Sequence, residues 1–64
     1  MTKRKINSAI KHTGLRVEGE RGAGCFHFVD AQSGYNIDDS TVWVAYLNQL
    51  TLDQWIERAE GVER

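Results

Sequence analysis

The sequence contains no proline, a single cysteine and no long apolar run, and these shortages exclude several classes of protein. Because Cys25 is the only thiol, no disulfide can form within the chain. A transmembrane helix needs about 18 to 20 consecutive apolar residues, and no such run is present. The basic start leads into no apolar stretch, so we expect no secretory signal and a cytoplasmic location. With 64 residues, we expect one domain, residues 1–64, with a thin core.

The net charge is also small, because eight basic residues are balanced by nine acidic ones, a formal total of −1. Broad nucleic-acid binding needs a basic stripe that neutralises phosphates, so the composition argues against it. The charges are nevertheless uneven, since residues 1–16 hold five basic residues and no acidic one. The sequence therefore predicts a dipolar molecule, provided that the two ends of the chain lie apart in space.

Two helices are predicted, one near each end of the chain. Thr2 is placed to cap the first, whose apolar residues recur at intervals of three and four before Gly14, a residue suited to the position after a helix. A capping box from Thr51 to Gln54 opens the second helix, and Gly61 ends it. Both helices are amphipathic, so each must bury its apolar stripe against another element.

Three strands are predicted between the helices. Residues 15–18 alternate apolar and polar side chains, while residues 25–29 and 41–47 are rich in aromatic and β-branched residues. Short turns between such strands are typical of an antiparallel meander. The predicted fold is therefore α+β: a three-stranded antiparallel sheet with the amino-terminal and carboxy-terminal helices packed on one face, in the order αβββα.

Side chains alternate along a strand, so the predicted sheet has two faces. We assign to the helix-covered core Leu15, Val17, Phe26, Phe28, Val42 and Val44, together with Ile6, Ile10, Leu52, Trp55 and Ile56. The other face holds Arg16, Glu18, Cys25, His27, Val29, Trp43, Ala45 and Leu47. Its last two strands are apolar, and exposed apolar patches mark contact sites. Alternatively, Tyr35, Ile37 or the connecting loops cover this face, or a slip of one residue in register exchanges the two faces.

No group of residues forms a convincing active site. The glycine-rich turn at residues 19–24 joins two strands and opens no helix, which argues against phosphate binding. Cys25 and His27 share a strand face, but no third residue is placed to orient the imidazole. Asp38 and Asp39 are adjacent rather than alternating, unlike the ligands of a calcium loop. We therefore predict that the protein is not an enzyme and holds neither a cofactor nor a metal.

Three runs carry a resemblance to known sequences: residues 28–30 (Phe-Val-Asp), 42–44 (Val-Trp-Val) and 47–55 (Leu-Asn-Gln-Leu-Thr-Leu-Asp-Gln-Trp). They resemble a group of very small uncharacterised proteins of bacteriophages and prophages. The resemblance covers most of the chain, although Cys25 and His27 stand where the group has aromatic residues. It implies a class of function, because accessory phage proteins of this size often bind and block a host protein, anti-CRISPR and other anti-defence factors among them.

We therefore expect a non-enzymatic protein-binding module that binds and inhibits a host protein or complex. We do not expect it to bind a membrane. The predicted contact residues are Trp43, His27, Val29 and Ala45 on the sheet face, with Lys3, Arg4, Lys5 and Lys11 as a second, basic patch. Two alternatives remain open. In the first, the same face forms a homodimer whose assembly carries the function. In the second, the basic amino-terminal helix binds nucleic acid weakly.

Overall fold

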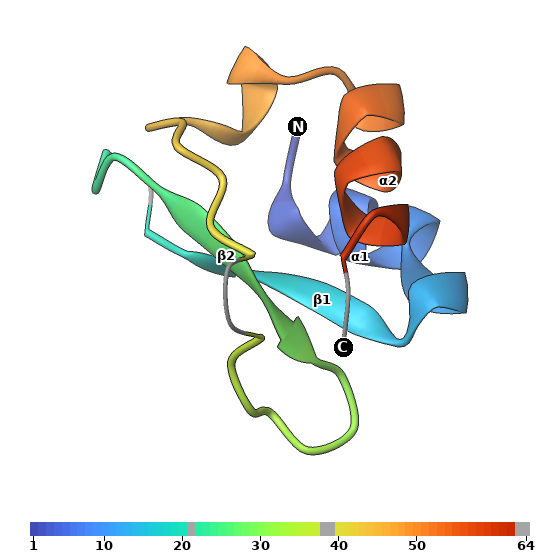
Figure 1. The fold of residues 1–64 in the computed structure, drawn as a ribbon. Coiled ribbons are helices and arrows are strands. Elements are labelled where there is room, and N and C mark those ends of the chain that lie inside the picture. The colour runs from blue at the N-terminus through green and yellow to red at the C-terminus, as the bar shows by residue number, and fades with distance from the viewer. Residues whose placement is uncertain (21, 38–39, 63–64) are drawn as a thin grey trace.

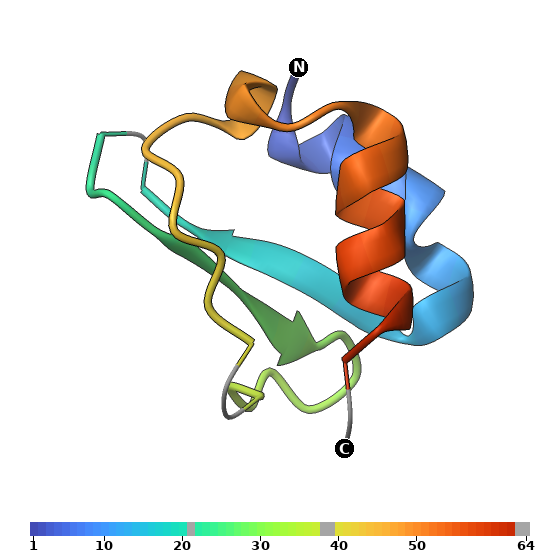
Figure 2. The same cartoon turned by 45° about the horizontal axis from the view of Figure 1, so that its top comes forward.

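The computed structural model describes residues 1–20, 22–37 and 40–62. The predicted loop residues Asp38 and Asp39 lie outside the described residues. Helix α1 (Lys3–Ala9) and the 3-10 turn η1 (Lys11–Thr13) lead into a hairpin of β1 (Leu15–Gly19) and β2 (Phe26–Asp30). A long connection then reaches the 3-10 turn η2 (Leu47–Gln49) and helix α2 (Leu52–Glu60). Both helices cover the same face of the hairpin (Figures 1 and 2).

The predicted starts of both helices and the end of the second at Gly61 are confirmed, whereas α1 ends at Ala9 and Gly14 ends the separate turn η1. The Thr2 hydroxyl accepts a hydrogen bond of 3.2 Å from the Lys5 N–H at the start of α1. Gly14 adopts the left-handed conformation, with φ of 74°, after η1. At α2 the capping box is complete, because the Thr51 hydroxyl accepts from the Gln54 N–H and the Gln54 side chain accepts from the Thr51 N–H. These local signals fix where both helices begin.

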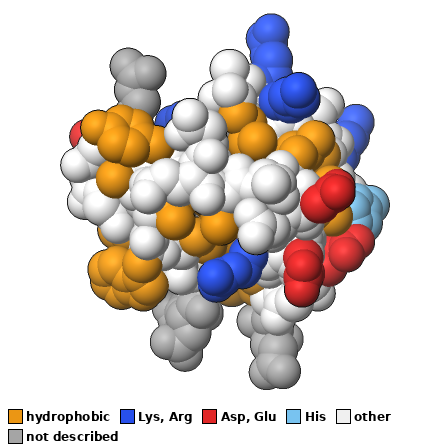
Figure 3. Space-filling view, turned by 90° about the horizontal axis from the view of Figure 1, so that it is seen from above, with side chains coloured by type: hydrophobic (Ala, Val, Ile, Leu, Met, Phe, Trp, Pro, Cys, Tyr) orange, Lys and Arg blue, Asp and Glu red, His pale blue; other side chains and the backbone are white. Residues whose placement is uncertain are grey.

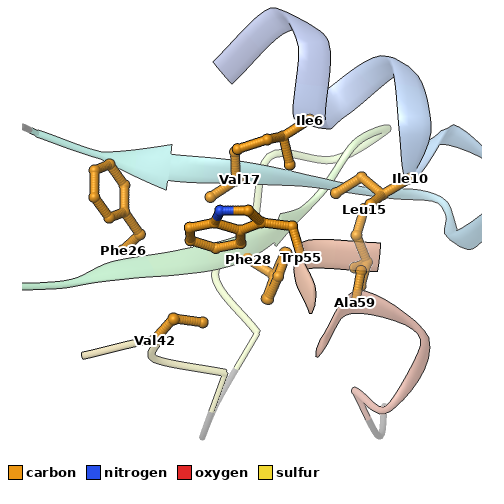
Figure 4. Packing of buried hydrophobic residues seen from close by; sticks show 9 residues of the cluster. All are labelled: Ile6, Ile10, Leu15, Val17, Phe26, Phe28, Val42, Trp55 and Ala59. Carbon is orange, nitrogen blue, oxygen red and sulfur yellow. The ribbon is translucent and has the colours of Figure 1, made fainter. Parts of the chain in front are cut away.

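Trp55 of α2 lies at the centre of the core (Figure 4). Its side chain is fully buried, and the edge-on rings of Phe26 and Phe28 have centroids 6.0 and 6.1 Å away. The indole N–H donates to the Leu47 carbonyl at 2.8 Å, so the one polar atom of this side chain is paired. Such pairing removes the penalty for burying a polar group, and Trp55 consequently ties α2, the hairpin and η2 together.

The predicted third strand is wrong, because the sheet has two strands while the α+β class fits. Val42 alone of residues 41–47 pairs with β2, exchanging hydrogen bonds of 2.9 and 2.6 Å with Phe26. After Val42 the chain turns away, and the N–H groups of Ala45 and Tyr46 donate to Gln49 Oε1 at 2.6 and 2.8 Å. A side-chain acceptor thus takes the donors that a strand would need, against the high β-propensity of this segment.

The outer edge of β2 is completed by the connection that follows it. The Phe28 N–H donates to Ser40 Oγ at 3.1 Å, and the Phe28 carbonyl accepts from the Ile37 N–H at 3.0 Å. The Asp30 N–H donates to the Tyr35 carbonyl at 2.9 Å. Irregular backbone and one buried hydroxyl therefore occupy the place where a third strand was expected.

The free edge of β1 is covered by side chains of α1. Asn7 Oδ1 accepts from the Val17 N–H at 2.7 Å, and Lys3 Nζ donates to the Gly19 carbonyl at 3.1 Å. Buried backbone groups need such partners, and here both edges of a two-stranded hairpin find them within the chain.

Candidate functional site

Trp43 is the most exposed large apolar side chain among the described residues, at 80% of its full area. Tyr35 follows at 77%, Tyr46 at 50% and Met1 at 46%. The sequence left open whether loops cover Trp43, and the structure shows it exposed. It lies on a connection rather than on a strand, however, because the chain leaves the sheet after Val42.

The segment of residues 43–46, called here the aromatic loop, is held at several points. The Gly22 N–H from the turn of the hairpin donates to the Ala45 carbonyl at 2.8 Å. Gln49 Oε1 accepts both N–H groups that begin the turn into η2. Trp55 fixes the next residue, Leu47, through its indole N–H. The loop therefore presents Trp43 and Tyr46 from a backbone with defined hydrogen bonds rather than from a free tether.

A cleft of about 280 Å³ lies beside the aromatic loop. Its lining residues are Met1, Tyr46, Leu47 and Asn48, and we call it the amino-terminal cleft. The whole stretch of residues 40–52 carries no charged side chain. Figure 3 views this end from above, with large hydrophobic side chains on the left and acidic side chains gathered beside a histidine on the right. Most of the acidic side chains in this view therefore lie away from the large hydrophobic side chains on its left.

Three of the four predicted basic contacts lie together and one lies apart. Lys3, Arg4 and Lys5 form the first turn of α1, next to Met1 and the amino-terminal cleft. Lys11 lies in η1, beyond the other end of α1, where the neighbouring His12 bonds Glu60 at 2.7 Å. Lys3 is engaged with the hairpin, whereas Arg4 and Lys5 are exposed. The basic patch therefore reduces to the first turn of α1.

The outer face of the sheet does not form the apolar surface that was predicted. Val29 is only 2% exposed, so it cannot supply a contact, while His27 and Ala45 are half-buried. Arg16 is the direct cross-strand partner of Val29. Directly opposite residues of an antiparallel pair lie on the same face, so the Arg16 side chain is a neighbour of Val29 on this face.

A polar hollow of about 390 Å³ lies on this outer face instead. Its lining residues are Lys3, Arg16, Glu18, Gly19, Glu20, His27, Val29, Gly34 and Asn36. Arg16 Nε donates to Glu18 Oε1 at 3.2 Å, which makes one ion pair at its edge. His27 and Val29 line this hollow, but Trp43 and Ala45 do not. The four residues predicted to form one contact surface therefore do not meet there.

The described residues contain no cluster of three possible metal ligands and no helix that could span a membrane. In residues 1–20, 22–37 and 40–62, no three His, Cys, Asp or Glu side chains come together as possible metal ligands. None of the described helices has the length and apolar character needed to span a bilayer. Gly22 and Gly24 have φ of 85° and 91°, which supports their predicted role in turn geometry.

Comparisons with protein-family models, curated proteins and solved structures found no match. The resemblance to small phage proteins therefore stays a prediction, and the candidate site rests on its geometry. Three of its residues, Met1, Tyr46 and Gln49, were not predicted from the sequence. The sequence offers one signal for them: residues 40–52 carry no charged side chain, whereas the first residues of the chain are basic.

Proposed function

We propose that the protein is a non-enzymatic protein-binding module whose contact surface is the aromatic loop. The observation that supports this most directly is the 80% exposure of Trp43 on a hydrogen-bonded backbone. Burying an aromatic side chain removes 150–250 Å² from water, worth about 4 to 6 kcal/mol at about 25 cal/mol per Å². The fold does not use that free energy, so it is available to a partner. Tryptophan and tyrosine are also the residues most enriched at the energetic centres of interfaces.

Partner binding on this surface must work through side chains. Partners often add a strand to an open sheet edge, but this mode needs unpaired backbone groups. Here Ser40, Ile37 and Tyr35 occupy the edge of β2, while Asn7 and Lys3 occupy that of β1. A rigid loop that fits into an apolar depression of the partner is the mode consistent with these contacts. Occluding a host protein, as the sequence resemblance implies, requires nothing more than such a surface.

The test compares two equally exposed aromatic residues in affinity capture from a lysate of the cells in which the protein is naturally made. Trp43→Asp should lose the captured partner, because a charge replaces the apolar anchor. Tyr35→Asp is the matched control, since Tyr35 is 77% exposed but lies on the turn after β2. Both variants should keep the wild-type thermal melt within about 0.5 kcal/mol, as is usual for surface changes.

Two results would count against the proposal. One is a Trp43→Asp variant that keeps its partner, and the other is a variant whose melt collapses, which would mean that Trp43 supports the fold. Light scattering at micromolar concentration addresses the homodimer alternative. A stable dimer whose assembly is lost in Trp43→Asp would assign the loop to a second copy of the chain.

A further inference from the structure

The two helices place their amino-terminal ends at the same end of the molecule. At that end, Met1 lines the amino-terminal cleft together with Tyr46, Leu47 and Asn48. At the opposite end, His12 bonds Glu60, the last residue of α2, at 2.7 Å. Figure 2 shows α2 running down the right of the view and α1 crossing behind it. One end of the molecule therefore carries the cleft and the basic turn, and the other carries the acidic end of α2.

The charges at the start of α1 oppose local helix stability. The first turn of α1 holds Lys3, Arg4 and Lys5 and no acidic residue, whereas α2 has Asp53 in its first turn and Arg58 in its last. Each charge placed against the helix dipole costs about 0.3 to 1 kcal/mol near the surface. Proteins that break a local stability rule do so most often where function requires it. The arrangement therefore points to an electrostatic role outside the fold.

Arg4 and Lys5 are the free charges of this turn. Lys3 is occupied, because its Nζ donates to the Gly19 carbonyl. Arg4 and Lys5 are exposed, and neither forms an ion pair with any residue that the structure describes. The Thr2 hydroxyl caps the N–H of Lys5, the third residue of α1, and the proposed contacts use the side chains of Arg4 and Lys5.

The distance between the free charges and the cleft is short. Arg4 is three residues from Met1, which is at most about 11 Å of extended chain. That length is comparable with the Debye length of about 8 Å at physiological ionic strength. The backbone of Arg4 therefore lies within about 11 Å of a residue that lines the cleft, close enough for its charge to influence a chain bound there.

We propose that the amino-terminal cleft and the basic turn bind an acidic protein segment, which inserts one apolar side chain between Met1 and Tyr46 and directs its carboxylates at Arg4 and Lys5. The inference rests on the proposed function and states the chemistry of the partner. Charge complementarity selects this occupant. A nucleic-acid strand would need a longer basic track, and the chain as a whole carries a net charge of −1.

The experiment is a titration of the full-length isotope-labelled protein, followed by amide chemical shifts. The probe is the synthetic peptide Glu-Glu-Leu-Phe-Glu-Glu, with Lys-Lys-Leu-Phe-Lys-Lys and a single-stranded oligothymidylate as comparisons. The acidic peptide should shift the amides of Tyr46, Leu47 and Asn48. The double change Arg4→Glu and Lys5→Glu should weaken its binding at least about tenfold. Lys11→Glu, an equally exposed lysine near the opposite end, is the matched control and should leave affinity within about twofold.

Four outcomes would overturn the inference: no shift with the acidic peptide, equal binding of the basic peptide, tighter binding of the oligothymidylate, or equal effects of the two sets of charge reversals. None of them touches the proposed function, which depends on partner capture through Trp43. If Trp43→Asp loses the captured partner and the acidic peptide shifts no amides, the proposed protein-binding function stands and the proposal of an acidic partner is rejected.

Discussion

Replacing Ser40 by alanine should destabilise the protein more than a surface change of the same chemistry. Ser40 is 7% exposed, and its Oγ accepts from the Phe28 N–H at 3.1 Å while lying 2.6 Å from the Ile37 carbonyl. Alanine keeps the backbone and removes this oxygen, leaving a buried N–H without a partner. An unsatisfied buried donor costs about 1 to 3 kcal/mol. For a domain of this size, each kcal/mol lowers the melting temperature by about 4 to 8 °C.

Thermal or urea unfolding measures the stability, and amide hydrogen exchange measures the cause. The Phe28 amide should exchange markedly faster in Ser40→Ala, because its acceptor is gone, while amides of α2 should change only in proportion to global stability. Ser33→Ala is the matched control, since Ser33 is exposed and its hydroxyl accepts a 3.3 Å bond from Tyr35. If Ser40→Ala and Ser33→Ala lose equally little stability, and Phe28 keeps its protection, the assignment of this hydroxyl to the sheet edge is refuted.

Two further predictions concern backbone positions. Gly19→Ala should lose at least about 2 kcal/mol, because φ is +141° and the new Cβ would meet the buried Phe26 ring at 2.7 Å. Gly22→Ala, with φ of +85° and no atom within 4 Å, should lose only the strain of about 1 kcal/mol; similar losses in urea melts would argue against the close contact. Thr51→Ala should lower stability by about 1 kcal/mol by removing the cap of α2. Thr51→Ser should restore most of it, and a serine variant as unstable as alanine would contradict the capping role.

The helices could be predicted from the sequence because their signals are local. Thr2, Thr51 and Gln54 act within four residues of themselves, and the structure places their hydrogen bonds as the pattern predicts. Most of the core could be predicted for a similar reason. The alternation along each strand, and the apolar stripe of α2 that contains Trp55, specify which side is buried. Such signals need no knowledge of distant partners.

The prediction of a third strand was wrong because other polar groups compete with a strand for the same backbone hydrogen bonds. High β-propensity at residues 41–47 describes a preference, whereas Gln49 supplies a nearby acceptor for two N–H groups and Ser40 takes the edge of β2. The bond from the Tyr46 N–H to Gln49 has the same three-residue spacing as that from Thr51 to Gln54, but tyrosine is not a usual capping residue. The contact of Ser40 with Phe28 spans 12 residues and has no local signal.

The candidate site was predictable in part. The sequence left open whether Trp43 is exposed, and the structure shows that it is, whereas Val29, which was grouped with it, is buried on the face that it shares with Arg16. A period of two along a strand assigns a side chain to a face, and it does not say whether a long polar neighbour lies over that side chain. Met1 and Tyr46 meet only because α1 and η2 come together in space.

The buried hydroxyl of Ser40 has a consequence for aggregation. A bare strand edge is a template on which other chains assemble into fibrils, and short hairpins are especially prone to it. Here the template is masked by a loop anchored at Ser40 and Val42, not by a full partner strand. Breaking these contacts would uncover the edge of β2, so resistance to aggregation depends on the hydroxyl of Ser40 and on the pairing of Val42 with Phe26.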